Sequence, residues 1–305
     1  MKRRLKSHNN NIFSKFTITK SIQPYLLLLP LFVMVALLFG YPIYRIISGS
    51  FYKIAIINGD MTFVGLDNYK KLFSSKVFLP TLWLTFRYTL LAVFLKLSLG
   101  FIMALFMNSE LYFSKTLKFL SLLPWALQQV TVAVIWKWIL DGNYGYLNFY
   151  LQKFGFISEN ISFLSNPITA FFAAAFVDAW LGLPMVSMMF SAGLSSINPS
   201  LYESAKIDGA GVIRRFFVIT CPCIKRVFLV TLTLVGIWTF NSFNVIFVLT
   251  GGGPMRSTET FILKIYEEAF AKFNLGLAYT LSSIAVLILF VFTLIYYKLD
   301  VEEEN

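Results

Sequence analysis

The hydrophobic positions of the chain form long unbroken runs that polar stretches separate. Runs of about 20 apolar residues are long enough to cross the hydrocarbon core of a bilayer as helices. Barrel strands would instead give alternating segments of about 10 residues. The pattern therefore predicts an all-α integral membrane protein with six transmembrane helices. They are expected over Tyr25 to Ile47, Trp83 to Met107, Phe119 to Leu140, Ile168 to Leu194, Val227 to Leu249 and Ala278 to Tyr297.

The Lys and Arg residues indicate the orientation of these helices, since short loops that are rich in them stay in the cytoplasm. They are concentrated in the N-terminal tail and in the loop between the fourth and fifth helices. Both termini are therefore predicted to be cytoplasmic. The first helix is expected to be retained, because it is too long for a signal-peptide core and no small-residue cleavage site follows it.

The composition leaves no room for a second folded unit, because 57% of the 305 residues are hydrophobic and only 13% are charged. We divide the chain into a basic cytoplasmic tail (1–22), the first helix with a partly structured outer loop (23–81), a core (82–298) and a cytoplasmic tail (299–305). The basic tail is interpreted as topogenic and lipid-facing rather than nucleic-acid-binding, because it abuts a long apolar helix. Its basic residues are Lys2, Arg3, Arg4, Lys6, Lys15 and Lys20.

A compact polar segment over residues 197–226 separates the fourth and fifth hydrophobic helices. A short helix is predicted at its start, because Ser200 and Glu203 have the spacing of a capping box, in which the Ser200 hydroxyl caps the first turn. Gly209 and Gly211 then permit the tight turn that ends this helix.

A second short helix is expected after the turn, over Val212 to Thr220, with Pro222 opening the next membrane helix. The segment is thus predicted to form a helix, turn and helix along the cytoplasmic surface. Two interpretations are open at this point. The segment is either a docking element for another protein or an amphipathic hairpin that lies on the membrane without a partner.

The sequence lacks the residues that common enzyme chemistry requires. No Gly-x-x-x-x-Gly-Lys-Ser/Thr loop is present to hold nucleotide phosphates. The two cysteines, Cys221 and Cys223, and the single histidine, His8, are too few to build a metal site. The chain is therefore predicted not to be an enzyme, and to bind no nucleotide, metal or other cofactor directly.

Two motifs carry a resemblance to a known family. Glu203-Ser204-Ala205 is followed after three residues by Gly209, and after nine more by Ile219-Thr220-Cys221-Pro222. This pattern resembles the "EAA" loop of permease subunits in bacterial binding-protein-dependent ABC importers. A second motif, Leu249-Thr250-Gly251-Gly252-Gly253-Pro254 followed by Thr258-Glu259-Thr260, resembles the carbohydrate-uptake branch, and its maltose-permease-like members in particular.

The resemblance extends from about Leu82 to Tyr297 and departs from the family pattern in a few places. Ser204 stands where a second alanine is usual, Cys221 where leucine is usual, and Arg226 where a second proline is common. The resemblance implies the type I ABC importer permease fold and a location in the bacterial plasma (inner) membrane. It also implies that the polar segment docks into a cytosolic ATPase through Glu203, Ser204, Ala205, Gly209, Ile219 and Pro222.

The same resemblance implies a set of partners. Two ATPase subunits would bind ATP and magnesium, and an extracytoplasmic substrate-binding protein would deliver a sugar or oligosaccharide. A second permease would supply the other half of the pathway, with a heterodimer favoured over a homodimer. The Gly251-Gly252-Gly253-Pro254 turn would contact the binding protein or shape the outer gate, unless it only returns the chain to the sixth helix.

Sugar-binding residues are expected near the fifth and sixth helices, since sugars bind to aromatic faces and to side chains that pair with hydroxyl groups. Asn241 and Asn244 are three residues apart, which would place both on one helical face. The alternative is that these polar residues form hydrogen bonds between helices. The candidates are Trp238, Asn241, Asn244, Tyr279 and Ser282.

Lys96 and Asp178 are charged residues inside predicted membrane helices. Because unpaired charges are costly in lipid, both are expected to face the interior or each other. A proton-relay role for them would favour an ion-coupled secondary carrier. That carrier, and an intramembrane enzyme, are the alternatives to an ABC importer subunit.

Overall fold

A computed structural model describes residues 25, 27–54, 60–109 and 114–304 of the chain. The predicted basic tail, which includes His8, lies outside the described residues. The last helix, α14 (Leu275–Glu304), extends into the predicted C-terminal tail (299–305).

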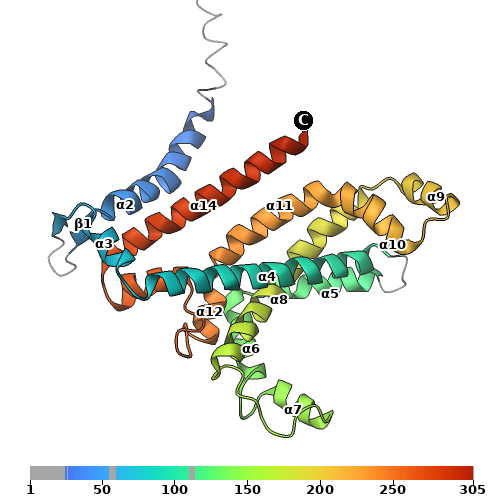
Figure 1. Ribbon diagram of the computed structural model, residues 1–305, viewed down its shortest axis with the longest axis horizontal. Helices are drawn as coiled ribbons and strands as arrows, with labels where there is room; N and C mark the ends of the chain where they lie inside the picture. The colour runs from blue at the N-terminus through green and yellow to red at the C-terminus, as the bar shows by residue number, and fades with distance from the viewer. Residues whose placement is uncertain (1–24, 26, 55–59, 110–113, 305) are drawn as a thin grey trace, which may run out of the picture.

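Long helices run side by side along the longest dimension of the molecule (Figure 1). The most extensive contact joins α4 (Phe78–Met107) to α8 (Pro167–Ser195), and α11 (Cys221–Phe240) packs against both. α14 contacts α11 and also α2 (Tyr41–Gly49). The prediction of an α-helical membrane protein is confirmed.

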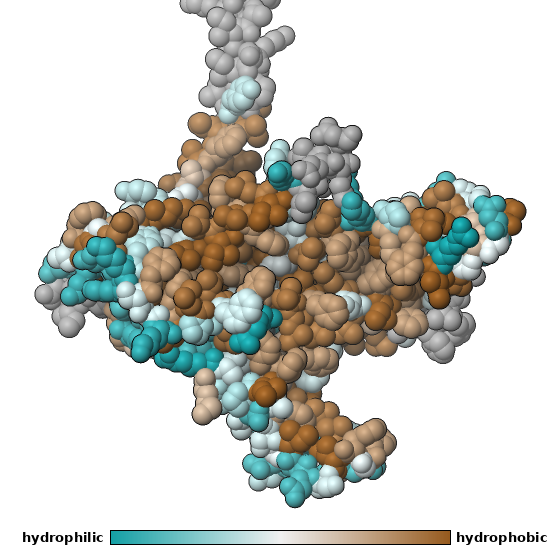
Figure 2. Space-filling view, in the orientation of Figure 1, coloured by the Kyte–Doolittle hydropathy of each residue, from teal (hydrophilic) through white to brown (hydrophobic). Residues whose placement is uncertain are grey.

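Five helices among the described residues are long and apolar enough to cross a membrane, and a bent helix pair makes a sixth if it counts as one span. Figure 2 shows apolar surface over the middle of the bundle, hydrophilic surface at one of its ends and a mixture of both at the other. The first span includes η1 (Ala36–Gly40), a π-helical turn, and α2. The five spans are Leu27–Gly49, Phe78–Met107, Pro167–Ser195, Val212–Phe240 and Leu275–Lys298.

The third predicted span is not a straight helix. It consists of α5 (Ser114–Ala126) and α6 (Gln129–Ile139), which meet at an angle of 100°. Pro124 lies near the end of α5, where its missing N–H weakens the helix, and Gln128 has an extended backbone. α6 therefore departs from the direction of α5, packs against α12 and leads to α7 (Tyr146–Lys153) (Figure 1).

The fifth predicted span is displaced along the chain. α10 (Val212–Arg215), the π-helical η2 (Phe216–Thr220) and α11 join end to end, so the predicted separate helix over Val212 to Thr220 is part of the span. The wider π turn lets the helix continue into Pro222. The helix then ends at Phe240, and a separate α12 (Asn244–Leu249) begins after a break.

The loop after the first span is partly structured, as predicted. It holds an antiparallel pair of strands, β1 (Tyr52–Ile54) and β2 (Met61–Phe63), and the short helix α3 (Asp67–Phe73). Asn68 ties this end together, because its side-chain amide donates to the carbonyls of Ser50 and Tyr52.

An ion cluster stabilises the segment between α12 and α14, which contains α13 (Phe261–Tyr266) and the π-helical η3 (Glu267–Ala271). The Lys264 ammonium lies 2.7 Å from Glu267 and 3.1 Å from the buried Glu259. Lys272 lies 3.0 Å from Glu267. Burial alone would raise the pKa of Glu267, but the hydrogen bonds and charges of both lysines outweigh it and lower that pKa to about 2.

The contact between α4 and α8 depends on small residues. Ala92 and Ala104 on α4 and Ala174 on α8 are fully buried. A Cβ atom at Gly100 would lie 2.5 Å from Cγ1 of Val186, which is too close for a normal contact. The missing side chain at Gly100 therefore leaves room for Val186 of α8 against the α4 backbone.

The variant Gly100→Ala is expected to lower the free energy of unfolding by about 1–3 kcal/mol, because the new methyl group would overpack the contact with Val186. Helix propensity acts in the opposite direction, since alanine favours helix over glycine. Thermal unfolding of the purified protein in detergent measures the change. Gly40→Ala is the control, because no heavy atom lies within 4 Å of its Cβ position. An unchanged or higher midpoint for Gly100→Ala would contradict this packing.

Acidification is expected to loosen the ion cluster only below about pH 4.5, the usual pKa of the Glu267 carboxyl. The pKa of Glu267 is lower in the folded protein, so its stabilising contribution is complete above pH 4.5 and is lost as the pH falls toward 2. Hydrogen exchange over residues 259–272, corrected for the intrinsic rate, measures this loosening. Glu267→Gln should weaken the acid dependence, and an equal dependence in that variant would assign it to another group.

Candidate functional site

A cavity of about 840 Å³ lies where the two broken helices meet. One break lies between α5 and α6, at Leu127 and Gln128, and the other lies between α11 and α12, at residues 241–243. Breaks inside a span leave backbone groups without helical partners, which is tolerated where they line a cavity or are buried in protein. The two breaks therefore mark this cavity as the candidate site.

Aromatic and amide side chains line the cavity. Trp125 and Trp238 are 63% and 48% exposed, so their ring faces are available to a solute. The Asn244 amide donates to the Gln129 Oε1 atom at 2.9 Å and thereby joins α12 to α6. Indole faces and amide groups suit a solute that carries both apolar C–H faces and hydroxyl groups. The polar lining also includes Gln128, Asn241 and Ser242.

The structure places the predicted sugar-binding residues in two separate regions. Trp238, Asn241 and Asn244 line the cavity. Tyr279 and Ser282 lie on α14 and do not line it. Tyr279 packs so closely against α2 that a Cβ atom at Gly49 would lie 2.5 Å from its ring.

The predicted shared helical face of Asn241 and Asn244 is wrong. Asn241 caps the end of α11, and Asn244 is the first residue of α12. The Asn241 side chain donates to the Ile237 carbonyl, and such bonds compete with continued helix. Both residues still line the cavity, because they lie on the two sides of the break between α11 and α12. Sequence reasoning missed Trp125, Gln128 and Gln129, although polar amides after Pro124 inside an apolar run were an available signal.

Lys96 and Asp178 pair with each other at one side of this cavity, as one of the two expectations stated. The Lys96 ammonium lies 2.8 Å from Asp178 Oδ2, and both side chains are buried. Lys137 reaches a polar partner as well, because its ammonium donates to the Val248 carbonyl at 3.2 Å.

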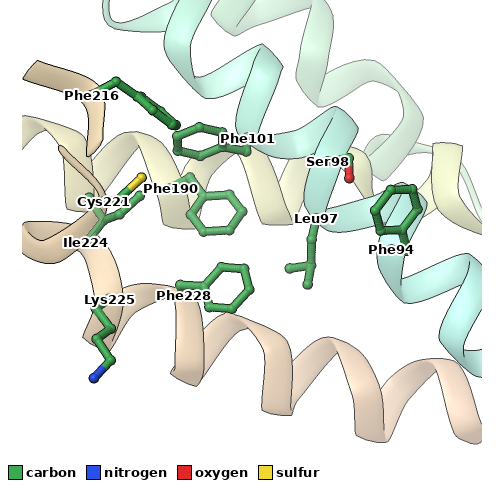
Figure 3. A pocket seen from close by; sticks show the side chains of 10 residues that line it. All are labelled: Phe94, Leu97, Ser98, Phe101, Phe190, Phe216, Cys221, Ile224, Lys225 and Phe228. Atoms are coloured by element: carbon green, nitrogen blue, oxygen red, sulfur yellow. The ribbon is translucent and has the colours of Figure 1, made fainter. Parts of the chain in front are cut away.

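A second cavity of about 450 Å³ lies between α4, α8 and the start of α11. Figure 3 shows the rings of Phe101, Phe190 and Phe228 gathered around it, while the ammonium of Lys225 points away. An apolar lining of this kind offers few partners to hydroxyl groups. The larger cavity at the helix breaks is therefore the better candidate for a polar solute.

The polar segment between the fourth and fifth predicted spans forms α9 (Pro199–Ile207) at one end of the molecule (Figure 1). Its cap differs from the predicted capping box. Asn198, and not Ser200, is the N-cap, because the Asn198 side chain accepts a hydrogen bond from the Ser200 N–H. Pro199 then occupies the first helical turn, where its missing N–H costs nothing.

The end of α9 agrees with the prediction. Gly209 has a φ of +75°, a left-handed conformation that glycine adopts without strain. The Gly209 N–H bonds to the Lys206 carbonyl and the Ala210 N–H to the Ala205 carbonyl, which is a Schellman motif. The turn is therefore fixed by backbone bonds and by the one residue type that suits its geometry.

α9 and the turn after it present a mixed polar and apolar surface. Glu203, Ser204 and Gly209 are exposed, Ala205 is half-buried, and Ile207 is 87% exposed. Farther along, Ile219 is half-buried and Pro222 is exposed. A contact between the Tyr202 and Thr220 hydroxyl groups, at 2.9 Å, braces α9 against η2. Exposed Val212 and Ile213 extend the apolar part of this surface.

Several known proteins resemble this chain. It is 32% identical to the trehalose/maltose transport system permease protein MalF of Thermococcus litoralis, over 95% of this chain and 97% of the relative. It is 31% identical to the sn-glycerol-3-phosphate transport system permease protein UgpA of Salmonella choleraesuis, over 90% of this chain and 92% of the relative. Among solved structures, a bacterial ABC transporter involved in the import of the acidic polysaccharide alginate superposes with a TM-score of 0.80. That alignment covers 95% of this chain and 99% of the other, at 22% identity.

The structural similarity confirms the predicted ABC importer permease fold. Residues 96–301 match the sequence profile of the family described as "Binding-protein-dependent transport system inner membrane component". The match covers well over half of the chain and includes both the cavity and α9. The chain therefore belongs to the family of inner membrane components of binding-protein-dependent transport systems.

Proposed function

We propose that this protein is the transmembrane subunit of an ATP-driven importer for a sugar or oligosaccharide, in which it forms half of the translocation pathway. The observation that carries the proposal is the cavity at the two helix breaks, with indole faces and amide groups in its lining. The similarity to a trehalose/maltose permease supports the sugar. Trp125, Trp238, Asn241 and Asn244 would contact the solute.

Energy for transport would enter at α9, the proposed ATPase-coupling helix. Its exposed Glu203 would provide a polar contact, and Ser204 and Ala205 leave room for a cleft to approach. The helix Val212–Phe240 starts directly after the turn at Gly209 and ends at the cavity, so it provides a continuous path between the two sites. The contact between Tyr202 and Thr220 would make α9 move together with this helix.

The proposed assembly has five subunits: this chain, a second permease, two copies of an ATPase and a binding protein. Two ATPase subunits would bind ATP and magnesium, while this chain would bind neither. A second, related permease would complete the cavity, and a homodimer is the alternative. An extracytoplasmic binding protein would deliver the solute, a partner kind that the family description supports. We place α9 and both termini in the cytoplasm, on the distribution of Lys and Arg.

An ion-coupled carrier and an intramembrane enzyme are less suited to these observations. The family to which the chain belongs works with binding proteins. Lys96 and Asp178, which had suggested a proton relay, are engaged with each other. A carrier would transport its solute alone in an ion gradient, whereas the proposed subunit needs its ATPase.

The variant Gly209→Ala is expected to reduce ATP-driven uptake several-fold. Its side chain would meet no other atom within 4 Å, but a φ of +75° costs a non-glycine residue about 1–2 kcal/mol, so the turn that orients α9 would shift. Uptake into proteoliposomes that contain all subunits, and co-purification of the ATPase, measure the effect.

Gly211→Ala is the matched control for this prediction. Gly211 also has open space around its Cβ position, but its φ is −64°, which alanine adopts without strain. Glu203→Lys should impair ATPase binding, whereas Glu159→Lys, an exposed charge reversal away from α9, should not. Full uptake with Gly209→Ala and Glu203→Lys would rule out α9 as the coupling site.

The variant Trp238→Ala is expected to raise the sugar concentration for half-maximal uptake about tenfold, because the cavity would lose one of its two indole faces. Trp138→Ala serves as the control, since Trp138 is 75% exposed on α6 and does not line the cavity. Equal effects of the two substitutions would show that the cavity is not the sugar site.

A further inference from the structure

Lys96 and Asp178 are part of a larger network than a single ion pair. The Lys96 ammonium also donates to the Thr239 hydroxyl at 2.8 Å, and the Ser242 hydroxyl donates to Asp178 Oδ1 at 3.0 Å. Each charged group therefore has the other and one hydroxyl group as partners. The network joins α4, α8, α11 and the break that follows α11.

The network holds the break in the fifth span from both sides. Thr239 lies in the last turn of α11, whereas Ser242 lies in the break itself. Asn241 and Asn244, on either side of Ser242, line the cavity. A shift of Ser242 away from Asp178 would therefore move both asparagines.

The shape of α8 suits the Lys96 side chain. Asp178 and Gly182 are four residues apart on α8, so they lie on one face of the helix, one turn from each other. A Cβ atom at Gly182 would lie 2.9 Å from Cδ and Cε of Lys96. The missing side chain at Gly182 thus leaves room for the lysine stem to cross α8 and reach Asp178.

The partners of the two charged groups limit what they can do for a solute. Lys96 and Asp178 border the cavity, but only 7% and 9% of their side chains are exposed. Hydrogen bonds to charged groups are stronger than those between neutral groups, so the ties to Thr239 and Ser242 fix those residues firmly. The pair is therefore built to hold neighbouring residues in place.

We propose that Lys96 and Asp178 are positioning residues of the solute cavity, which fix the break after α11 so that Asn241 and Asn244 face the solute. This inference rests on the proposed function of the cavity. The pair positions the residues of the break, and the amide and indole side chains contact the solute.

Disulfide cross-linking tests the position of the break without reference to any solute. Gln129→Cys and Asn244→Cys are introduced into the full-length chain, with Cys221 and Cys223 replaced by serine, and the chain is expressed with its partner subunits in membrane vesicles. The two side chains at 129 and 244 are in hydrogen-bond contact, so the cross-linking rate of a cysteine pair there reports how often α12 approaches α6. Copper phenanthroline provides the oxidant, and gel mobility measures the rate.

Ser242→Ala should slow this cross-linking about threefold or more, because it frees the break from Asp178 while Lys96 and Asp178 stay paired. Ser187→Ala is the matched control, since Ser187 is buried on α8 and bonds only within its own helix, to the Pro184 carbonyl. Lys96→Met/Asp178→Leu removes both charges together and should slow cross-linking in the same way. Unchanged rates in both test variants would overturn the proposal.

Uptake by chains without the cysteine reporters separates this inference from the proposed function. The solute is the one that the wild-type transporter accepts from a panel of maltose, trehalose and sn-glycerol 3-phosphate. Ser242→Ala should raise the half-saturating concentration with little change in maximal rate. A fall in stability or protein amount alone would mean a purely structural role and would also overturn the proposal. Slower cross-linking with unaltered uptake would instead reject the cavity as the solute site.

Discussion

Every backbone polar group inside a bilayer must find a partner, and this constraint explains where the working parts of the protein lie. Unbroken helices satisfy it without help, so α4 and α8 serve as the scaffold. At the break over residues 241–243, the Asn241 side chain donates to the Ile237 carbonyl, and a bond between the Asn244 and Gln129 side chains joins the two breaks. The cavity is therefore a consequence of the two breaks.

The same constraint acts on charged side chains. Lys96 and Asp178 would be costly in a membrane if either stood alone, and their pairing lowers that cost. Because Gly182 lets the lysine stem lie flat against α8, the pair also draws α4 and α8 together beside the cavity. The Lys96–Asp178 pair thus stabilises the scaffold of α4 and α8 and also the cavity beside it.

A single helix relates the cavity to the surface at the other end of the molecule. Val212–Phe240 continues through Pro222, because the π turn before the proline keeps the helix intact. It starts beside the turn at Gly209 and ends next to Asn241. A rigid helix of this length suits the transmission of movement better than two helices joined at Pro222, which the sequence had suggested.

The fold class was predictable because hydrophobic runs are local signals that survive in any tertiary arrangement. The turn at Gly209 was predictable for the same reason, since one glycine in the left-handed region ends α9 through its own backbone bonds. The cap at Asn198 was missed, although it too is local, because the serine and glutamate spacing after Pro199 gave a competing pattern.

The sequence by itself determined that the chain is a helical membrane protein and which of its segments are apolar. It also determined that the exposed polar helix α9 ends at the Gly209 turn. Only the tertiary structure decided where the third and fifth spans break, because a break leaves the average hydropathy of a run unchanged. It also decided that Trp125 and Gln129 join Trp238 and Asn244 in one cavity, while Tyr279 packs elsewhere. Contacts between helices are set by packing of residues far apart in the chain, which no local pattern records.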